Sequence, residues 1–212
     1  VGATYTVTHP SNVSKSSFST VPVLYRGATV DTSSDIIVGD EDGVCTVSTS
    51  TVLKCTAKIQ FRPAASGGDI DLTSAMAGSW KVGAVAVDMN NDANVKFQNG
   101  LGTKNVQRYS KLTVNASPEP VKKGKTVTVT GTLTRASWDT AKYYGYGTQS
   151  VKLQFRKKDS STYTTLKTIK TDSAGNLKTT TTATVDGYFR YSFAGTSTTS
   201  TVNATGDYVD VQ

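Results

Sequence analysis

The chain has 212 residues, a formal net charge of +7, 36% hydrophobic residues and only 18% charged residues. This length suits two domains of about 100 residues each or one large domain. The low charged fraction excludes a highly charged disordered chain, and no apolar run approaches the roughly 20 residues of a membrane span, so no transmembrane segment is expected.

The first half of the sequence alternates as β-strands do. Residues 3–8 read as a first strand, and residues 53–62 carry the cleanest alternation. In that run the apolar positions share one face, namely Leu53, Cys55, Ala57, Ile59 and Phe61. A period of two with polar residues between indicates a strand with one buried face. We predict an N-terminal β-sandwich domain over residues 1–106.

The only two cysteines are Cys45 and Cys55. One pair cannot supply the four ligands of a structural zinc site, and no CxxC motif is present. Residues 48–51, between the cysteines, are polar and suit the tip of a hairpin. We therefore predict a disulfide, as in exported proteins. Closing this loop would stabilise the fold by about 2.5–3 kcal/mol on the chain-entropy model.

Asp88, Asn90 and Asp92 have the one-three-five oxygen spacing of a calcium loop. Ala93 stands where such a loop has glycine, and Asn99 where it has the bidentate glutamate. These departures favour a polar hairpin turn over a weak calcium site, because Asp and Asn side chains also bond their own backbone in turns. No other cofactor is expected.

The second half begins a new alternating pattern near residues 107–112. The strands expected there lie around residues 126–133, 151–156 and 189–193, with a glycine turn at 173–176. This half holds most of the positive charge: residues 113–212 contain thirteen basic and seven acidic residues, a net charge of +6. Such a charge favours anionic partners, although lysines on a solvated strand face would give the same count. We predict a second β-sandwich domain over residues 107–212.

The second half also resembles a known family. Its motifs are KLTVNASPEPVKKGKTVTVTGTLT, SVKLQFRKK, TDSAGNLKTT and DGYFRYSFAGT. They resemble bacterial Ig-like domains of secreted actinobacterial proteins over about 107–212, and residues 1–106 match more loosely. The resemblance implies an all-β chain of two tandem immunoglobulin-like β-sandwich domains. It implies little about activity, because such domains serve as spacers, anchors and binding modules.

The search for catalytic residues is mostly negative. His9 is the only histidine, and no GxSxG, HExxH, P-loop or GxGxxG motif is present. Paired carboxylates from distant loops stay open as an alternative. We predict that the chain is not an enzyme.

The most suggestive binding residues are aromatic and lie in an expected long loop over residues 136–149. Amphipathic rings on such a loop can stack on sugars or contact a protein, although they could equally cover the end of the sandwich or the domain junction. Nearby lysines would add attraction for anions. The predicted ligand-binding residues are Trp138, Tyr143, Tyr144, Tyr146, Lys122 and Lys123.

Together these features predict a secreted, non-enzymatic binding or display protein at the cell surface or in the extracellular matrix. The expected partner is a protein or an anionic cell-wall or matrix polymer. Nucleic acid is not expected, because the basic clusters lie in no RRM or OB-like motif. The alternative function is an extracellular effector such as a protease inhibitor, which would use the hairpin between Cys45 and Cys55 as its inserted loop.

Overall fold

The structure is a computed structural model that describes residues 1–66 and 72–212. It is all-β, with eighteen strands, two short 3-10 helices and no α-helix in the described part of the chain. Neither of those helices is long and apolar enough to cross a membrane. The chain divides into two compact units: the first comprises residues 1–72 and 79–106, and the second comprises residues 73–78 and 107–212.

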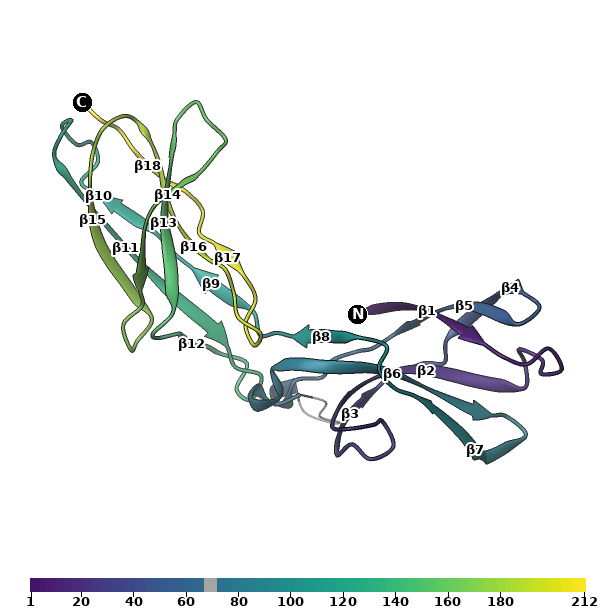
Figure 1. The fold of residues 1–212 in the computed structure, drawn as a ribbon. Helices are drawn as coiled ribbons and strands as arrows, with labels where there is room; N and C mark the ends of the chain where they lie inside the picture. Colours follow the sequence, from purple (N-terminus) through teal and green to yellow (C-terminus); the bar gives the residue numbers. More distant parts are fainter. Residues whose placement is uncertain (67–71) are drawn as a thin grey trace. The chain divides into compact units, whose positions relative to one another are not determined.

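The first unit is built from two antiparallel sheets (Figure 1). One has the order β1-β5-β4, and the other has the order β3-β2-β6-β7 with β8 also paired to β6. The strands are β1 Gly2–Thr8, β2 Phe18–Arg26, β3 Asp35–Val38, β4 Val44–Thr49, β5 Val52–Lys58, β6 Gly78–Asp88, β7 Asn91–Gln98 and β8 Thr103–Val106. The short helices η1 Ala64–Ser66 and η2 Ser74–Met76 lie between β5 and β6.

The alternation predicted for β5 is observed. Leu53, Cys55 and Ala57 are buried, while the residues between them are exposed. The strand ends at Lys58 rather than at residue 62, although Ile59 remains buried. On the neighbouring sheet, Trp80 of β6 is almost fully buried. The apolar period therefore locates the buried face correctly, but it runs past the end of the hydrogen-bonded strand.

The second unit contains β9 to β18 in two further sheets. In one sheet β11 is central: β9 and β10 pair with it, as do β12 and β15. The other has the order β14-β13-β16-β17, with β18 also paired to β16. The strands are β9 Ser110–Leu112, β10 Asn115–Ser117, β11 Thr126–Ala136, β12 Tyr143–Gly145, β13 Ser150–Lys157, β14 Thr164–Lys170, β15 Asn176–Thr182, β16 Gly187–Phe193, β17 Val202–Asn203 and β18 Asp207–Val209.

A single core joins the two sheets of the second unit into a sandwich. Its buried residues come from both sheets: Leu112, Ala116, Val121, Val127, Val129, Leu133, Val151, Leu153, Leu177, Ala183, Phe189, Tyr191, Phe193, Ala204 and Val209. The hydroxyl of Tyr191 on β16 donates a hydrogen bond of 2.9 Å to the carbonyl oxygen of Val129 on β11. Packing and one buried polar link therefore hold the layers together without any cysteine.

Gly131 interrupts the apolar alternation of β11 for a steric reason. A Cβ at this position would collide with the carbonyl oxygen of Thr113 and would come within 2.9 Å of the Tyr191 ring. A glycine allows this close approach of β11 to its neighbours. The same strand continues to Ala136, so it reaches from the basic turn at residues 122–125 to the aromatic segment.

Candidate functional site

The segment predicted as a long aromatic loop contains the short second strand of a β-hairpin. β11 continues to Ala136, and β12 pairs with it so that Ala136 lies opposite Tyr143 and Arg135 opposite Tyr144. The amide of Ser137 donates to the carbonyl oxygen of Lys142, which closes the tip. The prediction of a loop over 136–149 therefore holds for residues 137–142 and 146–149, but it missed the short strand β12. The glycines and consecutive tyrosines of this segment do not show the alternation of a strand. β12 forms because β15 pairs with β11 only as far as Thr132, which leaves residues 134–136 of β11 free to pair with β12.

The four predicted aromatic residues do not form one surface. Tyr143 and Tyr144 are adjacent on a strand, so their side chains leave it on opposite faces. They are 38% and 52% exposed. Tyr146 is half-buried against the core and meets the Phe193 ring edge-on, with centroids 5.9 Å apart. Trp138 is half-buried at the hairpin tip. Tyr146 therefore packs against the core, whereas Tyr143 and Tyr144 are exposed on opposite faces of β12 and cannot belong to one surface of the sheet.

A tyrosine that the sequence analysis missed lies in line with Tyr143. The carbonyl oxygen of Tyr109 accepts a 2.8 Å hydrogen bond from the amide of Ala136, so the two residues are cross-strand neighbours. Ala136 in turn lies opposite Tyr143. The Tyr109 side chain is 73% exposed. Leu112 is buried, so the alternation of a strand places Lys111 and Tyr109 on the opposite, exposed face. Reading this alternation back from Leu112 to residue 109 in the sequence would have identified Tyr109 as a surface residue.

Lys111 completes this surface. Its Nζ lies 4.1 Å from the centroid of the Tyr143 ring, in a cation-π contact. We call the surface formed by Tyr109, Lys111, Ala136 and Tyr143 the tyrosine patch. The rings of Tyr109 and Tyr143 thus flank the small side chain of Ala136, with the Lys111 cation beside Tyr143. Rings of this kind offer large contact area at little cost in side-chain entropy.

Two arginines make this end of the second unit positive. The guanidinium of Arg135 lies 4.0 Å from the centroid of the Tyr146 ring. The Nε of Arg108 is buried and has no hydrogen-bond partner among the described residues. Burial lowers the pKa of Arg108, and the like charge of Arg135 lowers it further. The excess of positive charge here would favour an anionic group.

Polar groups around these arginines are themselves fixed by hydrogen bonds. Burial opposes ionisation of Tyr146, but hydrogen bonds with Thr196 and Thr199 and the charge of Arg135 outweigh it, so its pKa is lowered. Hydrogen bonds from the Ser74 hydroxyl and amide lower the pKa of Asp139. The Ser74 hydroxyl also accepts a hydrogen bond from the Trp138 amide, at 2.9 Å. The hairpin tip is thus anchored to residues 73–78, which belong to the same unit.

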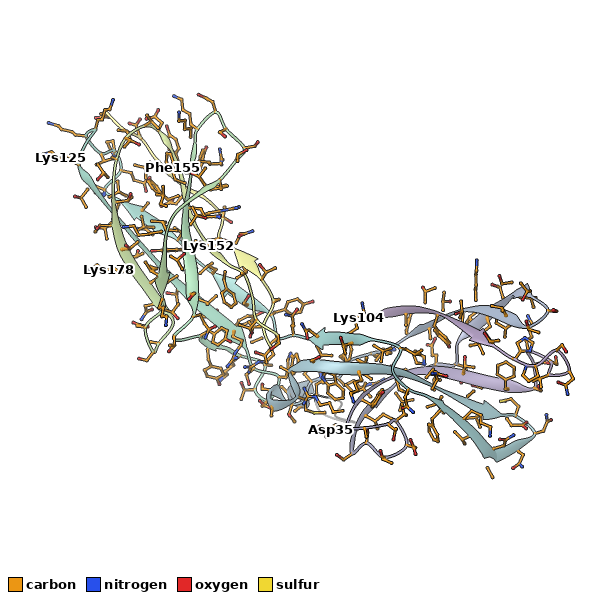
Figure 2. The ribbon with its side chains drawn as sticks, viewed as in Figure 1. Asp35, Lys104, Lys125, Lys152, Phe155 and Lys178 are labelled. Carbon is orange, nitrogen blue, oxygen red and sulfur yellow. A yellow bond between two sulfur atoms is a disulfide. The ribbon has the colours of Figure 1, made fainter. Side chains whose placement is uncertain are left out.

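The structure separates the predicted lysines from the aromatic residues. Lys122 and Lys123 are exposed in the turn before β11, whereas the tyrosines lie beside the other end of that strand. A rise of about 3.3 Å per residue places the two ends roughly 33 Å apart. Figure 2 labels Lys125, which marks the basic end of β11. Lys122 and Lys123 therefore cannot contact the same small ligand as Tyr143.

The acidic segment predicted as a weak calcium site forms a hairpin. β6 and β7 pair so that Asp88 lies opposite Asn91. Asp88 accepts hydrogen bonds from the Asn90 amide at 2.9 Å and from the Asn94 side chain at 3.3 Å. The Asn90 hydrogen bond is the main cause of the lowered pKa of Asp88. The turn is therefore observed. The side chain of Asp92 lies outside the described residues, and calcium binding stays a prediction.

Within residues 1–66 and 72–212, no group of three or more His, Cys, Asp or Glu side chains is placed to hold a metal ion. His9 lies at the end of the first strand region, with its Nδ1 2.9 Å from the carbonyl oxygen of Pro10. This contact engages the ring with its own turn rather than with a serine hydroxyl.

The predicted disulfide is confirmed. Cys45 and Cys55 lie directly opposite each other on β4 and β5, with an S–S distance of 2.04 Å. The hairpin turns at residues 50–51, inside the polar stretch predicted for its tip. β4 is the edge strand of its sheet, so the bond ties an edge to the centre.

No protein-family model matches the chain, and no curated protein matches it. Among solved structures, the chain is similar to the D00-D0 domain of Intimin, with 15% sequence identity, 99% of each chain covered and a TM-score of 0.32.

Proposed function

We propose that the chain is an extracellular, non-enzymatic binding protein of two Ig-like sandwich domains that acts at the cell surface or in the matrix. The observation that carries this proposal is the tyrosine patch, in which Ala136 of β11 lies between Tyr109, directly before β9, and Tyr143 of β12. Binding surfaces concentrate their energy in a few aromatic and arginine side chains.

The strand order of the second unit supports the Ig-like assignment. The sheet around β11 joins β9, β10 and β15, while the facing sheet joins β14, β13, β16 and the final strands. Sheets that mix early and late strands in this way are typical of Greek-key sandwiches of the Ig class. These folds often bind through the loops at the ends of the sandwich, and Ala136 and Tyr143 lie at the two ends of the loop between β11 and β12.

The disulfide supports the extracellular assignment. Disulfides persist in oxidising compartments and are rare in the reducing cytosol. The chain has no other cysteine.

The test is binding of the intact protein to cells, wall polysaccharide and matrix material. Tyr109→Ala and Tyr143→Ala should each weaken binding by about 30-fold, because loss of a hot-spot ring costs about 2 kcal/mol. Tyr144→Ala is the matched control: Tyr144 has the same chemistry and neighbours Tyr143, but its side chain lies on the opposite face. If the Tyr109 and Tyr143 variants bind like the unaltered protein, the tyrosine patch is not the site.

A protease inhibitor is the second candidate, and it rests on the β4–β5 hairpin. Val44 and Val47 are exposed on the edge strand β4, and the Cys45–Cys55 bond holds that strand to β5. An exposed, cross-linked edge can pair with an extended strand of another protein. Inhibition of secreted serine proteases or metalloproteases near equimolar ratio, lost on reduction, would favour this function over the first.

A further inference from the structure

The outward face of the second sheet of the second unit carries an unusual set of side chains. On β13, β16 and β18 the residues that alternate with the core are Lys152, Gln154, Arg156, Tyr188, Arg190, Ser192 and Tyr208. Three of these are cationic and none is acidic. We call this surface, together with Tyr163 from the loop between β13 and β14, the arginine face.

Tyrosine rings hold both guanidinium groups of the arginine face. The Cζ of Arg156 lies 3.8 Å from the centroid of the Tyr188 ring, and the Cζ of Arg190 lies 3.8 Å from that of Tyr163. Tyr188 in turn packs against Tyr208, with centroids 5.1 Å apart. Stacking of this kind fixes the plane of the guanidinium before any ligand arrives, so less entropy is lost on binding.

Gly206 provides the room for this arrangement. A Cβ at Gly206 would collide with the hydroxyl of Tyr163 and would lie 3.2 Å from the Cβ of Tyr188. Without a side chain at this position, Tyr163 can cross from its loop and lie over Arg190. The cluster is therefore built by the chain between β17 and β18 as well as by the strands that carry it.

The two arginines differ in the donors that they leave free. Nη1 of Arg156 donates to the carbonyl oxygens of Lys158 and Ser160, which anchors the loop. Arg190 donates from Nε to Gln154 Oε1 at 2.9 Å, and no described residue accepts a hydrogen bond from its Nη groups. Both Nη groups of Arg190 are therefore without an acceptor among the described residues, a geometry suited to bidentate pairing with a carboxylate.

The three cations form a zigzag across two strands. Lys152 lies opposite Ser192 and Arg156 lies opposite Tyr188, so Arg190 is the diagonal neighbour of both cations. Diagonal neighbours in an antiparallel pair are about 7–8 Å apart. A linear ligand with regularly repeated negative charges could contact all three.

We propose that the arginine face binds an acidic polysaccharide. Carboxylates of the polymer pair with Arg190 and Lys152, and sugar rings pack on Tyr163 and on Tyr208, which is 36% exposed. Tyrosine rings offer an apolar surface on which the apolar faces of sugar rings can pack, and a surface made only of charged groups would not. The disulfide favours a polysaccharide over nucleic acid, because it indicates an oxidising compartment.

This inference goes beyond the proposed function, because the tyrosine patch lies on the other sheet, on β9, β11 and β12. The two sites can therefore fail separately. Tyr109→Ala should leave binding to an acidic polysaccharide unchanged, whereas variants of Arg190 should leave binding at the tyrosine patch unchanged.

The test is titration of the intact protein with polygalacturonate, with dextran as a neutral polysaccharide of the same ring size. Arg190→Ala should weaken polygalacturonate binding about tenfold, as expected for loss of a charge-assisted hydrogen bond. Lys152→Ala should weaken it less, by about threefold. The matched control is Lys178→Ala, since Lys178 is an exposed lysine on β15 in the opposite sheet (Figure 2).

Two further comparisons, of Arg190 variants and of other anionic polymers, test the proposal. Arg190→Lys retains the charge but loses the bidentate donors, so it should bind more weakly than the unaltered protein; this variant decides the result if Arg190→Ala does not fold. Equal binding by the Arg190→Lys variant and the unaltered protein, or by the Arg190→Ala and Lys178→Ala variants, would overturn the proposal. Tighter binding of polyglutamate or single-stranded DNA than of polygalacturonate would also overturn it, and would identify another class of partner.

Discussion

Each unit is stabilised internally by a different kind of interaction. The first unit ties its edge strand β4 to β5 with the Cys45–Cys55 bond. The second unit has no cysteine and joins its sheets through one continuous core and the buried hydrogen bond from Tyr191 to Val129. A disulfide acts largely by restricting the unfolded chain, whereas packing acts on the folded state. Neighbouring β units of one chain can therefore depend on different terms of the folding free energy.

The two units also differ in the side chains that they expose. In the second unit, exposed rings are arranged in rows with cations, as in the tyrosine patch and the arginine face. In the first unit, several exposed large apolar side chains are aliphatic and lie on strands near sheet edges, such as Val38, Val44 and Val47. The second unit could therefore bind a partner through aromatic and cationic side chains, and the first could bind one through an exposed sheet edge.

The largest expected effect is the loss of packing in the second unit. Leu153 is fully buried in its core, so Leu153→Ala should destabilise this unit by about 2–5 kcal/mol. Hydrogen exchange followed by mass spectrometry would report each unit through its own peptides. Protection should fall over residues 126–193. Lys152→Ala, on the opposite side of the same strand, is the control, and equal loss of protection in both variants would contradict the central place of this core.

Reduction of the disulfide should affect the other unit. The loop spans residues 45–55, so its release should destabilise the first unit by about 2.5–3 kcal/mol on the chain-entropy model. Exchange in peptides from β4 and β5 should accelerate after reduction. The second unit serves as an internal control because it contains no cysteine. Unchanged exchange in the first unit would mean that the bond does not contribute to its stability.

Tyr191→Phe would probe the polar link between the sheets of the second unit. It leaves the Val129 carbonyl without its buried donor, which should cost about 1–3 kcal/mol. Chemical denaturation of the variant and of the unaltered protein, followed by fluorescence, measures the difference. A stability equal to that of the unaltered protein would show that the Val129 carbonyl finds another donor.

The Tyr191→Phe variant should also change how the free energy of unfolding depends on pH in the alkaline range. Burial raises the pKa of Tyr191 well above its ordinary value. Above about pH 10 the unfolded chain therefore loses this proton while the folded chain retains it, and the free energy of unfolding falls as pH rises. The Tyr191→Phe variant should show a flatter decline above pH 10. An identical decline in both proteins would assign it to other groups.

The smallest expected effect concerns a turn of the second unit at acid pH. Asp172 accepts hydrogen bonds from the amides of Asn176 and Ala174 at 2.8 and 2.9 Å, and the Asn176 amide is the main cause of its lowered pKa. Its contribution is present above the ordinary Asp pKa of about 3.9 and is lost as pH falls below it. Asp172→Ala should flatten the acid limb of stability slightly, which chemical denaturation of the variant and of the unaltered protein at acid pH would measure. An identical acid limb in both proteins would contradict this contribution.

Much of the fold follows from local patterns. The alternation in residues 53–58 and 151–155 marks the buried faces of β5 and β13, because one wet face imposes a period of two. The disulfide follows from two cysteines that flank a polar tip. The turn at Asp88 follows from Asp and Asn side chains that bond their own backbone. In each case the signal and the structure lie within a few residues of each other.

The sequence by itself determined the all-β class, the Cys45–Cys55 pair and the strands around residues 3–8, 53–58, 126–133, 151–156 and 189–193, because these depend on neighbours along the chain. Only the tertiary structure decided which rings share a surface. Tyr109 meets Tyr143 across Ala136, and Tyr163 meets Arg190 over Gly206. Strand pairing joins residues far apart in the chain, and a shift of register by one residue moves every side chain to the other face. Composition can reveal the tyrosines and arginines, but register places them together.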